Sequence, residues 1–98
     1  TLSSIMGSIA ENDSSGDFIY RSSKAAVNAV MKSLAGDLKS DGITVAVLHP
    51  GWVRTDMGGL DAAIEAPESV TGMRAVIAGL KERDSGRCLN YDGTEIPW

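Results

Sequence analysis

The chain has 98 residues, of which 43% are apolar and 22% are charged, and its formal net charge is −4. This composition is typical of one globular domain and excludes a disordered or fibrous protein. The nine Lys and Arg residues are scattered, which argues against nucleic acid as a partner. No apolar run approaches the roughly 18 residues of a membrane span, so we expect no membrane partner.

Cysteine usage and the lack of a targeting signal predict a cytoplasmic location. No basic segment followed by a cleavable apolar core opens the chain. The single cysteine, Cys88, cannot form an internal disulfide, which agrees with a reducing compartment. No histidine or second cysteine lies near Cys88 at the spacing of metal ligands. We therefore interpret it as a small buried residue and expect no metal site.

The first four residues, Thr1–Ser4, have the pattern of the end of a strand. Because Thr1 is not an initiator methionine, we expect the chain to be a fragment. The segment from Ile5 to Asp17 is dense in Gly, Asn, Asp and Ser, which predicts a loop.

A long amphipathic helix is predicted from about Phe18 to Lys39. Asp41-Gly42 ends it, because glycine readily takes the left-handed conformation that closes helices. The apolar stripe of this helix faces either the core or a subunit interface. Its residues recur at three and four spacing, and they are Val27, Val30, Leu34 and Leu38.

The segment Ile43–Leu48 is β-branched and apolar with almost no polar alternation, which predicts a strand covered on both faces, as in parallel sheets. His49-Pro50-Gly51 stops this strand. The following segment, 52–65, is polar and contains glycine, and a short helical turn is expected around Leu60 to Ile64.

A second helix is predicted from Ala66 to about Arg83, with Pro67 at an early position and Glu68 in its first turn. Ser85-Gly86 ends it, and Arg87–Tyr91 reads as a short last strand before the turn at Asp92-Gly93.

The order of elements is strand end, helix, strand, helix, strand, which predicts an α/β fold. A parallel strand needs neighbours on both edges and helices on both faces, and this chain cannot supply them all. We therefore expect residues 1–98 to be the C-terminal part of a Rossmann-type doubly wound parallel sheet that lacks the N-terminal cofactor-binding strands.

Tyr20 and Lys24 lie four residues apart at the start of the first helix, so both fall on one face. A fixed positive charge near a phenol stabilises the phenolate and makes the phenol a usable acid or base near neutral pH. The pair alone is weak, since Tyr20 read by itself is a half-exposed helix residue beside a solvated lysine.

The chain resembles the C-terminal half of a short-chain dehydrogenase/reductase. Three motifs carry this resemblance in the order typical of the family: Ser3-Ser4-Ile-Met-Gly7, then Tyr20-x-x-x-Lys24, then Pro50-Gly51-Trp-Val53-x-Thr55. Finer details are similar to C-factor-like and sniffer-like carbonyl reductases. These details are Gly7-Ser-Ile9, Tyr20-Arg-Ser-Ser-Lys-Ala-Ala26, Asp56-Met-Gly-Gly59, Tyr91-Asp-Gly93 and Pro97-Trp98.

The resemblance implies a catalytic set. Tyr20 matches the catalytic acid/base, and Lys24 matches the lysine that stabilises its phenolate form and binds the nicotinamide ribose. Ser4 matches the serine that donates to the substrate oxygen, with Ser3 as the weaker candidate. This logic is consistent, because positioned O–H donors stabilise the oxyanion character that develops during hydride transfer.

The turn after the buried strand is the expected cofactor-binding segment. Pro50 and Gly51 end the strand where open α/β sheets bind ligands. By resemblance, the backbone of Val53 and the hydroxyl of Thr55 hold the nicotinamide carboxamide. The glycine-rich pyrophosphate turn is absent, and the subfamily resemblance favours NADP(H) over NAD(H).

Several residues have structural alternatives. Ser4 could cap loop backbone instead of binding substrate. His49, the only histidine, is expected to be structural because a Tyr/Lys/Ser set is present. Trp52 and Met57 either line the substrate cleft or pack the turn.

The sequence thus predicts an NAD(P)H-dependent oxidoreductase that reduces a carbonyl to an alcohol, or the reverse, with a small-molecule substrate. A homodimer through the helix that starts near Tyr20 is implied by the family. The isolated chain is expected to be inactive. The alternatives are a reductase-fold binding or signalling protein of C-factor type, and a truncated inactive fragment.

Overall fold

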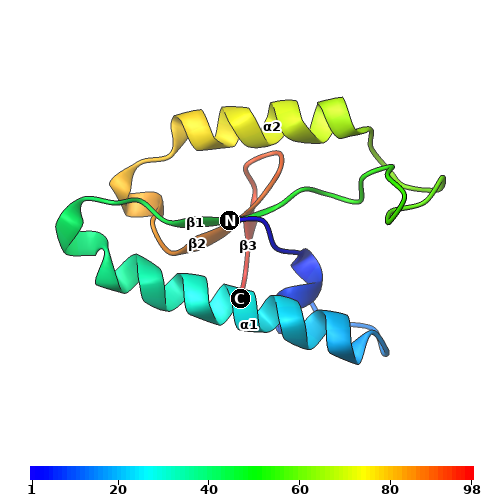
Figure 1. Cartoon of the computed structure of the whole chain (residues 1–98), viewed down its shortest axis with the longest axis horizontal. Helices are drawn as coiled ribbons and strands as arrows, with labels where there is room; N and C mark the ends of the chain where they lie inside the picture. The colour runs from blue at the N-terminus through cyan, green and yellow to red at the C-terminus, as the bar shows by residue number, and fades with distance from the viewer.

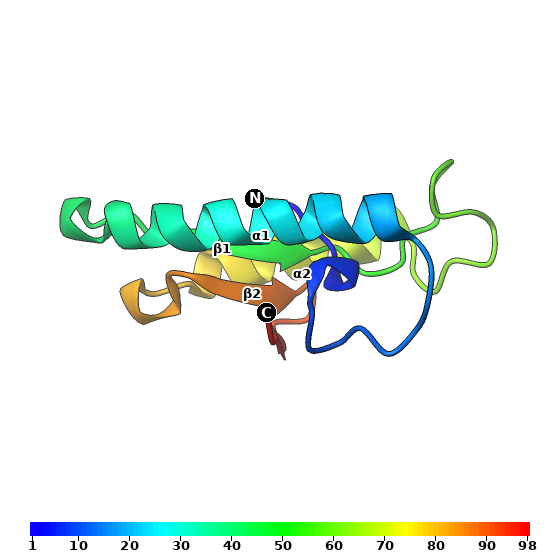
Figure 2. The same cartoon turned by 90° about the horizontal axis from the view of Figure 1, so that it is seen from below.

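The computed structural model describes residues 1–98, in which a small sheet lies between two helices (Figure 1). Helix α1 (Phe18–Asp37) covers one face of the sheet and α2 (Ala66–Gly79) covers the other. In Figure 2, turned by 90° and seen from below, α1 lies nearest the viewer and α2 lies behind the strands. The predicted α/β class is confirmed. Neither helix combines the length and the apolarity that crossing a membrane would require.

The sheet contains β1 (Ala46–His49), β2 (Arg87–Asn90) and β3 (Glu95–Ile96) in the order β1-β2-β3. Strands β1 and β2 are parallel, as predicted, and Val47 lies opposite Cys88. Strand β3 is antiparallel to β2, with Ile96 opposite Cys88.

The sequence interpretation placed the last strand before the turn at Asp92-Gly93 and expected a parallel sheet. The sheet is mixed, because the turn sends the chain back along β2. Asp92 Oδ1 accepts hydrogen bonds from the backbone N–H (2.9 Å) and the hydroxyl (2.7 Å) of Thr94. Gly93 supplies a positive φ of 91°. This tight turn makes two residues after it, Glu95 and Ile96, into a third strand.

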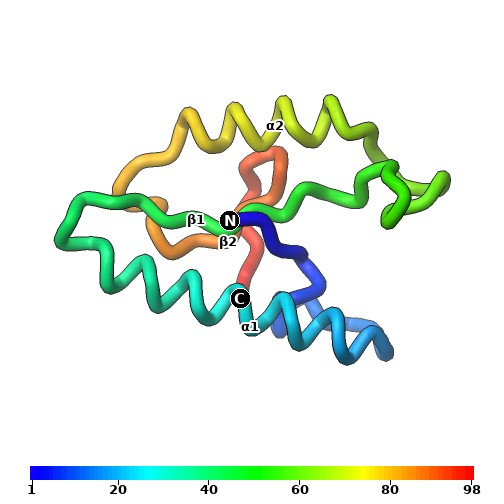
Figure 3. Tube along the Cα trace, viewed as in Figure 1, coloured from blue at the N-terminus to red at the C-terminus, as the bar shows by residue number.

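The N-terminal segment runs beside β1, on the edge that β2 does not occupy. Leu2 forms a parallel bridge with Leu48, Ser3 N–H donates to Leu48 O (2.9 Å), and Leu48 N–H donates to Thr1 O (2.8 Å). The expected strand end at Thr1–Ser4 is therefore present. The chain then turns through a short 3₁₀ helix, Ile5–Gly7, and passes along the side of α1 (Figure 3, blue).

The helices end close to the predicted positions. Helix α1 stops at Asp37, and Gly42, with φ 69°, closes the short 3₁₀ turn that follows. Helix α2 stops at Gly79, four residues before the predicted end. The reason is local: Lys81 N–H donates to Asp84 Oδ2 (2.9 Å), which starts a separate 3₁₀ turn, Glu82–Asp84. The helical turn expected around Leu60 to Ile64 is wrong, because Ile64 instead forms a parallel bridge with Val53.

The core lies between α1 and the sheet. Val47, Cys88 and Ile96 are buried there, and Met31 and Trp98 pack against them. Cys88 is buried, as the sequence predicted. The apolar stripe of α1 is only partly covered, since Val30 is 64% exposed and Leu34 is 37% exposed.

Candidate active site

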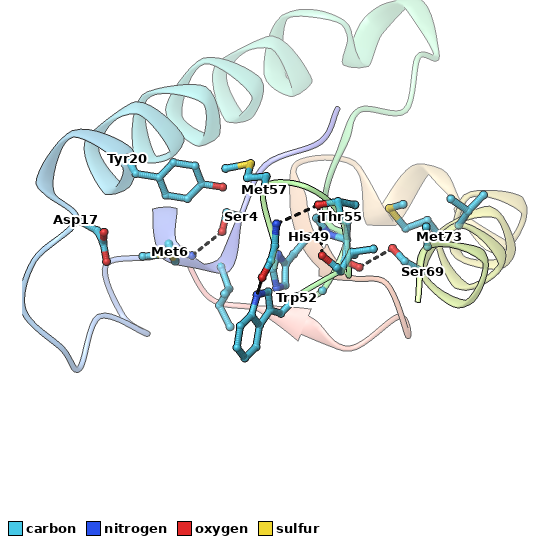
Figure 4. A pocket seen from close by; sticks show the side chains of 17 residues that line it. Ser4, Met6, Asp17, Tyr20, His49, Trp52, Thr55, Met57, Ser69 and Met73 are labelled. Carbon is cyan, nitrogen blue, oxygen red and sulfur yellow. Dashed lines mark hydrogen bonds between the residues drawn. The ribbon is translucent and has the colours of Figure 1, made fainter. Parts of the chain in front are cut away.

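A cavity of about 820 Å³ opens at the carboxyl end of β1, where α/β sheets bind ligands (Figure 4). Its walls come from the N-terminal 3₁₀ turn, the start of α1, the turn after β1 and the first turns of α2. Six of the seven sequence-predicted site residues line it. They are Ser4, Tyr20, Pro50, Gly51, Val53 and Thr55.

Tyr20 lies in the first turn of α1, and its side chain points into the cavity (Figure 4). Lys24 follows one turn later but does not line the cavity. Its Nζ lies 5.6 Å from the centre of the Tyr20 ring. The helix thus brings the ammonium to the phenol at a distance where a cation and an aromatic face attract each other.

Ser4 and Ser3 are both buried, at 6% and 5% exposure, but they face different surroundings. Ser4 lines the cavity, and its Oγ accepts a hydrogen bond from Met6 N–H (3.2 Å) as the N-cap of the 3₁₀ turn. The hydroxyl proton of Ser4 remains free to donate. Ser3 Oγ instead donates to Lys24 O (3.4 Å) and does not line the cavity. The geometry therefore favours Ser4 as the residue that meets a bound molecule.

Gly7 allows the segment that carries Ser4 to dock against α1. A Cβ at this position would lie 2.7 Å from the carbonyl carbon of Lys24 and 2.9 Å from Asn28 Nδ2. Real Cβ atoms do not approach backbone so closely, so only glycine fits. This close approach sets the position of Ser4 relative to Tyr20.

The turn after β1 has the shape that Pro50-Gly51 predicts. Gly51 has a φ of 83°, and a Cβ there would lie 2.7 Å from Ile64 Cδ1. Ser69 Oγ, from α2, donates to Pro50 O and holds the turn against the helix.

Val53 and Thr55 offer hydrogen-bonding groups near the cavity. The N–H of Val53 donates to no group of the chain, although its neighbour Arg54 N–H donates to Ile64 O (2.8 Å). Thr55 Oγ1 accepts from Gly58 N–H (3.0 Å) and lies 3.4 Å from Val53 O. One backbone donor is therefore free at this wall.

Trp52 and Met57 both line the cavity. Trp52 also stabilises the turn, because its Nε1–H donates to Gly58 O (2.8 Å) (Figure 4). Met57 is 81% exposed at the mouth.

His49 lines the cavity without forming a hydrogen bond through its buried Nδ1. Burial lowers the pKa of His49 from its ordinary value, so the imidazole is neutral over more of the physiological range. Its expected structural role stays a prediction.

The sequence interpretation gave no site role to eight of the lining residues, among them Met6, Asp17 and Met73. Asp17 stands just before the predicted helix, so its position at the cavity end could have been inferred from Tyr20. Met73 comes from α2, more than 50 residues after Tyr20, and no local pattern indicates that the two share a cavity.

These features define a Rossmann-type α/β unit whose cavity collects hydroxyl groups at the carboxyl end of a parallel strand. The chain belongs to the short chain dehydrogenase family, whose model matches residues 2–65.

Relatives extend the match over almost the whole chain. The C-signal protein of Myxococcus xanthus is 52% identical over 97 residues, which cover 99% of this chain and 58% of that protein. The solved structure of the carbonyl reductase Sniffer of D. melanogaster is 46% identical, with a TM-score of 0.96. An NADPH-bound carbonyl reductase from chicken fatty liver is 39% identical, with a TM-score of 0.91.

Both structures match 99% of this chain, which covers 39% of the Sniffer chain and 41% of the chicken chain. The chain thus spans about half the length of the relatives it matches. The resemblance to C-factor-like and sniffer-like reductases is confirmed.

Proposed function

We propose that residues 1–98 are the C-terminal catalytic half of an NADP(H)-dependent carbonyl reductase, or of an alcohol dehydrogenase running in reverse. The observation that carries the proposal is that Ser4 and Tyr20, from separate segments, line one cavity, while Lys24 Nζ lies 5.6 Å from the Tyr20 ring. The substrate is a small carbonyl compound or secondary alcohol.

Tyr20 acts as the general acid in reduction and as the general base in oxidation. As the carbonyl carbon gains a hydride, its oxygen gains negative charge and takes the proton of the Tyr20 hydroxyl. Ser4 donates a hydrogen bond to the same oxygen, which stabilises the transition state more than the ground state. Lys24 stabilises the phenolate that remains on Tyr20.

The wall formed by residues 50–55 fits a nicotinamide. The free N–H of Val53 can donate a hydrogen bond to the carboxamide oxygen. Thr55 also lines the cavity, and its Oγ1 can accept a hydrogen bond from the carboxamide N–H. Gly51 keeps this wall free of a side chain. When bound, the reduced nicotinamide supplies the hydride. NADP(H) is favoured because the chicken carbonyl reductase structure is described as NADPH bound.

The test is reduction of a carbonyl compound by the full-length protein, followed by the absorbance of NADPH. Tyr20→Phe should lower kcat/KM by about 10²- to 10⁴-fold, because the ring is kept and only the proton donor is lost. Tyr91→Phe is the matched control, since Tyr91 is the only other tyrosine and does not line the cavity. Equal rates for the two variants would refute the role of Tyr20.

A second candidate is a binding or signalling protein that retains the reductase fold. It is favoured by the 52% identity to a protein named C-signal. A full-length Tyr20→Phe variant that loses reduction but keeps its biological effect would support this function over the enzymatic one.

We further propose a homodimer through α1, where Val30 and Leu34 are exposed. The isolated chain is expected to be inactive.

A further inference from the structure

One carboxylate lies among the residues that line the cavity, and it belongs to Asp17. No Lys or Arg lines the cavity, and burial lowers the pKa of its only histidine, His49, which favours the neutral imidazole. The rest of the wall is apolar or carries neutral hydroxyl groups. Among the residues of this chain that line the cavity, Asp17 is therefore the only one that carries a formal charge.

The Asp17 carboxylate has no partner within the chain. Asp17 is the N-cap of α1, a position where aspartate normally accepts a hydrogen bond from the helix backbone, but its side chain makes no such bond. It forms no ion pair. The nearby Arg21 guanidinium donates elsewhere, to Ser14 Oγ (2.7 Å) and to Met6 O (3.5 Å).

The backbone of Asp17 is also unusual. It has φ 52° and ψ 32°, and it is the only residue other than glycine with a positive φ. This left-handed conformation is unfavourable for most residues other than glycine, and less so for Asp and Asn. Its side chain makes no hydrogen bond to the helix backbone, and the residue lines the cavity.

Figure 4 shows Asp17 at one end of the cavity, beside the start of α1. Met73 and Ser69, from α2, lie at the other end, and Tyr20 and Ser4 lie between. When the carbonyl oxygen of a bound molecule contacts Tyr20 and Ser4, the rest of that molecule extends toward one of the two ends. One end carries the Asp17 carboxylate, and the other carries the Met73 thioether.

We propose that Asp17 determines the charge selectivity of the cavity. It favours carbonyl substrates that carry a cationic group remote from the carbonyl, and it disfavours substrates that carry a carboxylate there. This inference rests on the proposed carbonyl reduction and specifies its substrate class.

The test uses the full-length protein and three benzaldehydes that differ at the para position. They carry a trimethylammonium group, a tert-butyl group or a carboxylate. The first two groups have the same shape and differ in charge. Asp17→Asn removes the charge, keeps the side-chain shape, and suits the left-handed backbone. Intrinsic differences in aldehyde reactivity cancel when each aldehyde is compared between the two proteins.

In Asp17→Asn, kcat/KM for the trimethylammonium aldehyde, relative to the tert-butyl aldehyde, should fall about three- to tenfold. The same ratio for the carboxylate aldehyde should rise by a similar factor, and high salt should reduce both effects. A circular dichroism spectrum that matches the wild-type spectrum shows that the variant is folded. Asp13→Asn is the matched control, because Asp13 is exposed, as Asp17 is, but does not line the cavity.

Unchanged ratios in Asp17→Asn, with the tert-butyl aldehyde still reduced, would overturn the inference and leave the proposed function standing. They would mean that Asp17 has no role in the choice of substrate. Equal changes in Asp13→Asn would also overturn it, because the effect would then come from overall charge. Failure of the wild-type protein to reduce any of the three aldehydes would count against the proposed function itself.

Discussion

Replacing Gly7 with alanine tests whether Ser4, the proposed catalytic serine, is positioned by a direct contact between the N-terminal turn and α1. The new Cβ would lie 2.7 Å from Lys24 C, 2.9 Å from Ala25 N and 2.9 Å from Asn28 Nδ2. Two of these atoms belong to the helix backbone, which cannot move aside as a flexible side chain can. The N-terminal turn and α1 must therefore separate by several tenths of an ångström.

Overpacking of this kind costs about 1–3 kcal/mol of unfolding free energy. The same separation moves Ser4 away from Tyr20, and a misplacement of about 1 Å can cost 10²-fold in rate. We expect Gly7→Ala in the full-length protein to lower the unfolding free energy by about 1–3 kcal/mol and kcat by about tenfold. Urea denaturation followed by circular dichroism measures the first quantity, and steady-state NADPH oxidation measures the second.

Gly36→Ala is the matched control, because Gly36 lies within α1 and a Cβ there meets nothing within 4 Å. The helix should gain about 0.5–1 kcal/mol from the better helix former, with no change in kcat. If Gly7→Ala were as stable and as active as the wild type, this result would contradict a close contact between the N-terminal turn and α1.

Two further predictions concern the end of β1. Gly51→Ala places a side chain at φ 83°, 2.7 Å from Ile64 Cδ1, so it should destabilise the protein by about 1–2 kcal/mol and weaken NADPH binding severalfold. If this variant bound NADPH as tightly as the wild type in a fluorescence titration, the result would argue against residues 50–55 as the nicotinamide-binding segment.

Burial lowers the pKa of His49, so the unfolded chain binds a proton more readily than the folded one. Stability from the neutral imidazole is present above about pH 6.5 and is lost as the pH falls toward the folded pKa. His49→Asn should therefore flatten the fall in unfolding free energy between about pH 7 and 5, and an unchanged slope would contradict the burial of this side chain.

The sequence predicted the two helices and the two parallel strands, because hydrophobic periodicity and glycine positions are local signals. It missed β3, which follows a turn and has only two residues, too few for any alternation to show. It also extended α2 by four residues, since the hydrogen bond between Lys81 and Asp84 that starts a new turn has no periodic signature.

Some site residues could likewise be predicted from local sequence signals, and others could not. Tyr20 and Lys24 could be paired from the sequence, because the helical repeat alone places them one turn apart. Their order relative to Ser4 and Pro50-Gly51 sufficed for the family. Sequence periodicity predicts the proximity of residues only within about one helical turn or one strand repeat.

The tertiary structure alone decided which serine meets the cavity. Ser3 and Ser4 are adjacent and chemically identical, and only packing against α1 turns Ser3 toward Lys24 O while Ser4 faces the open space. It also placed Asp17 and Met73 at opposite ends of one cavity. Such proximity arises from contacts between segments far apart in the chain, which no local pattern of residues encodes.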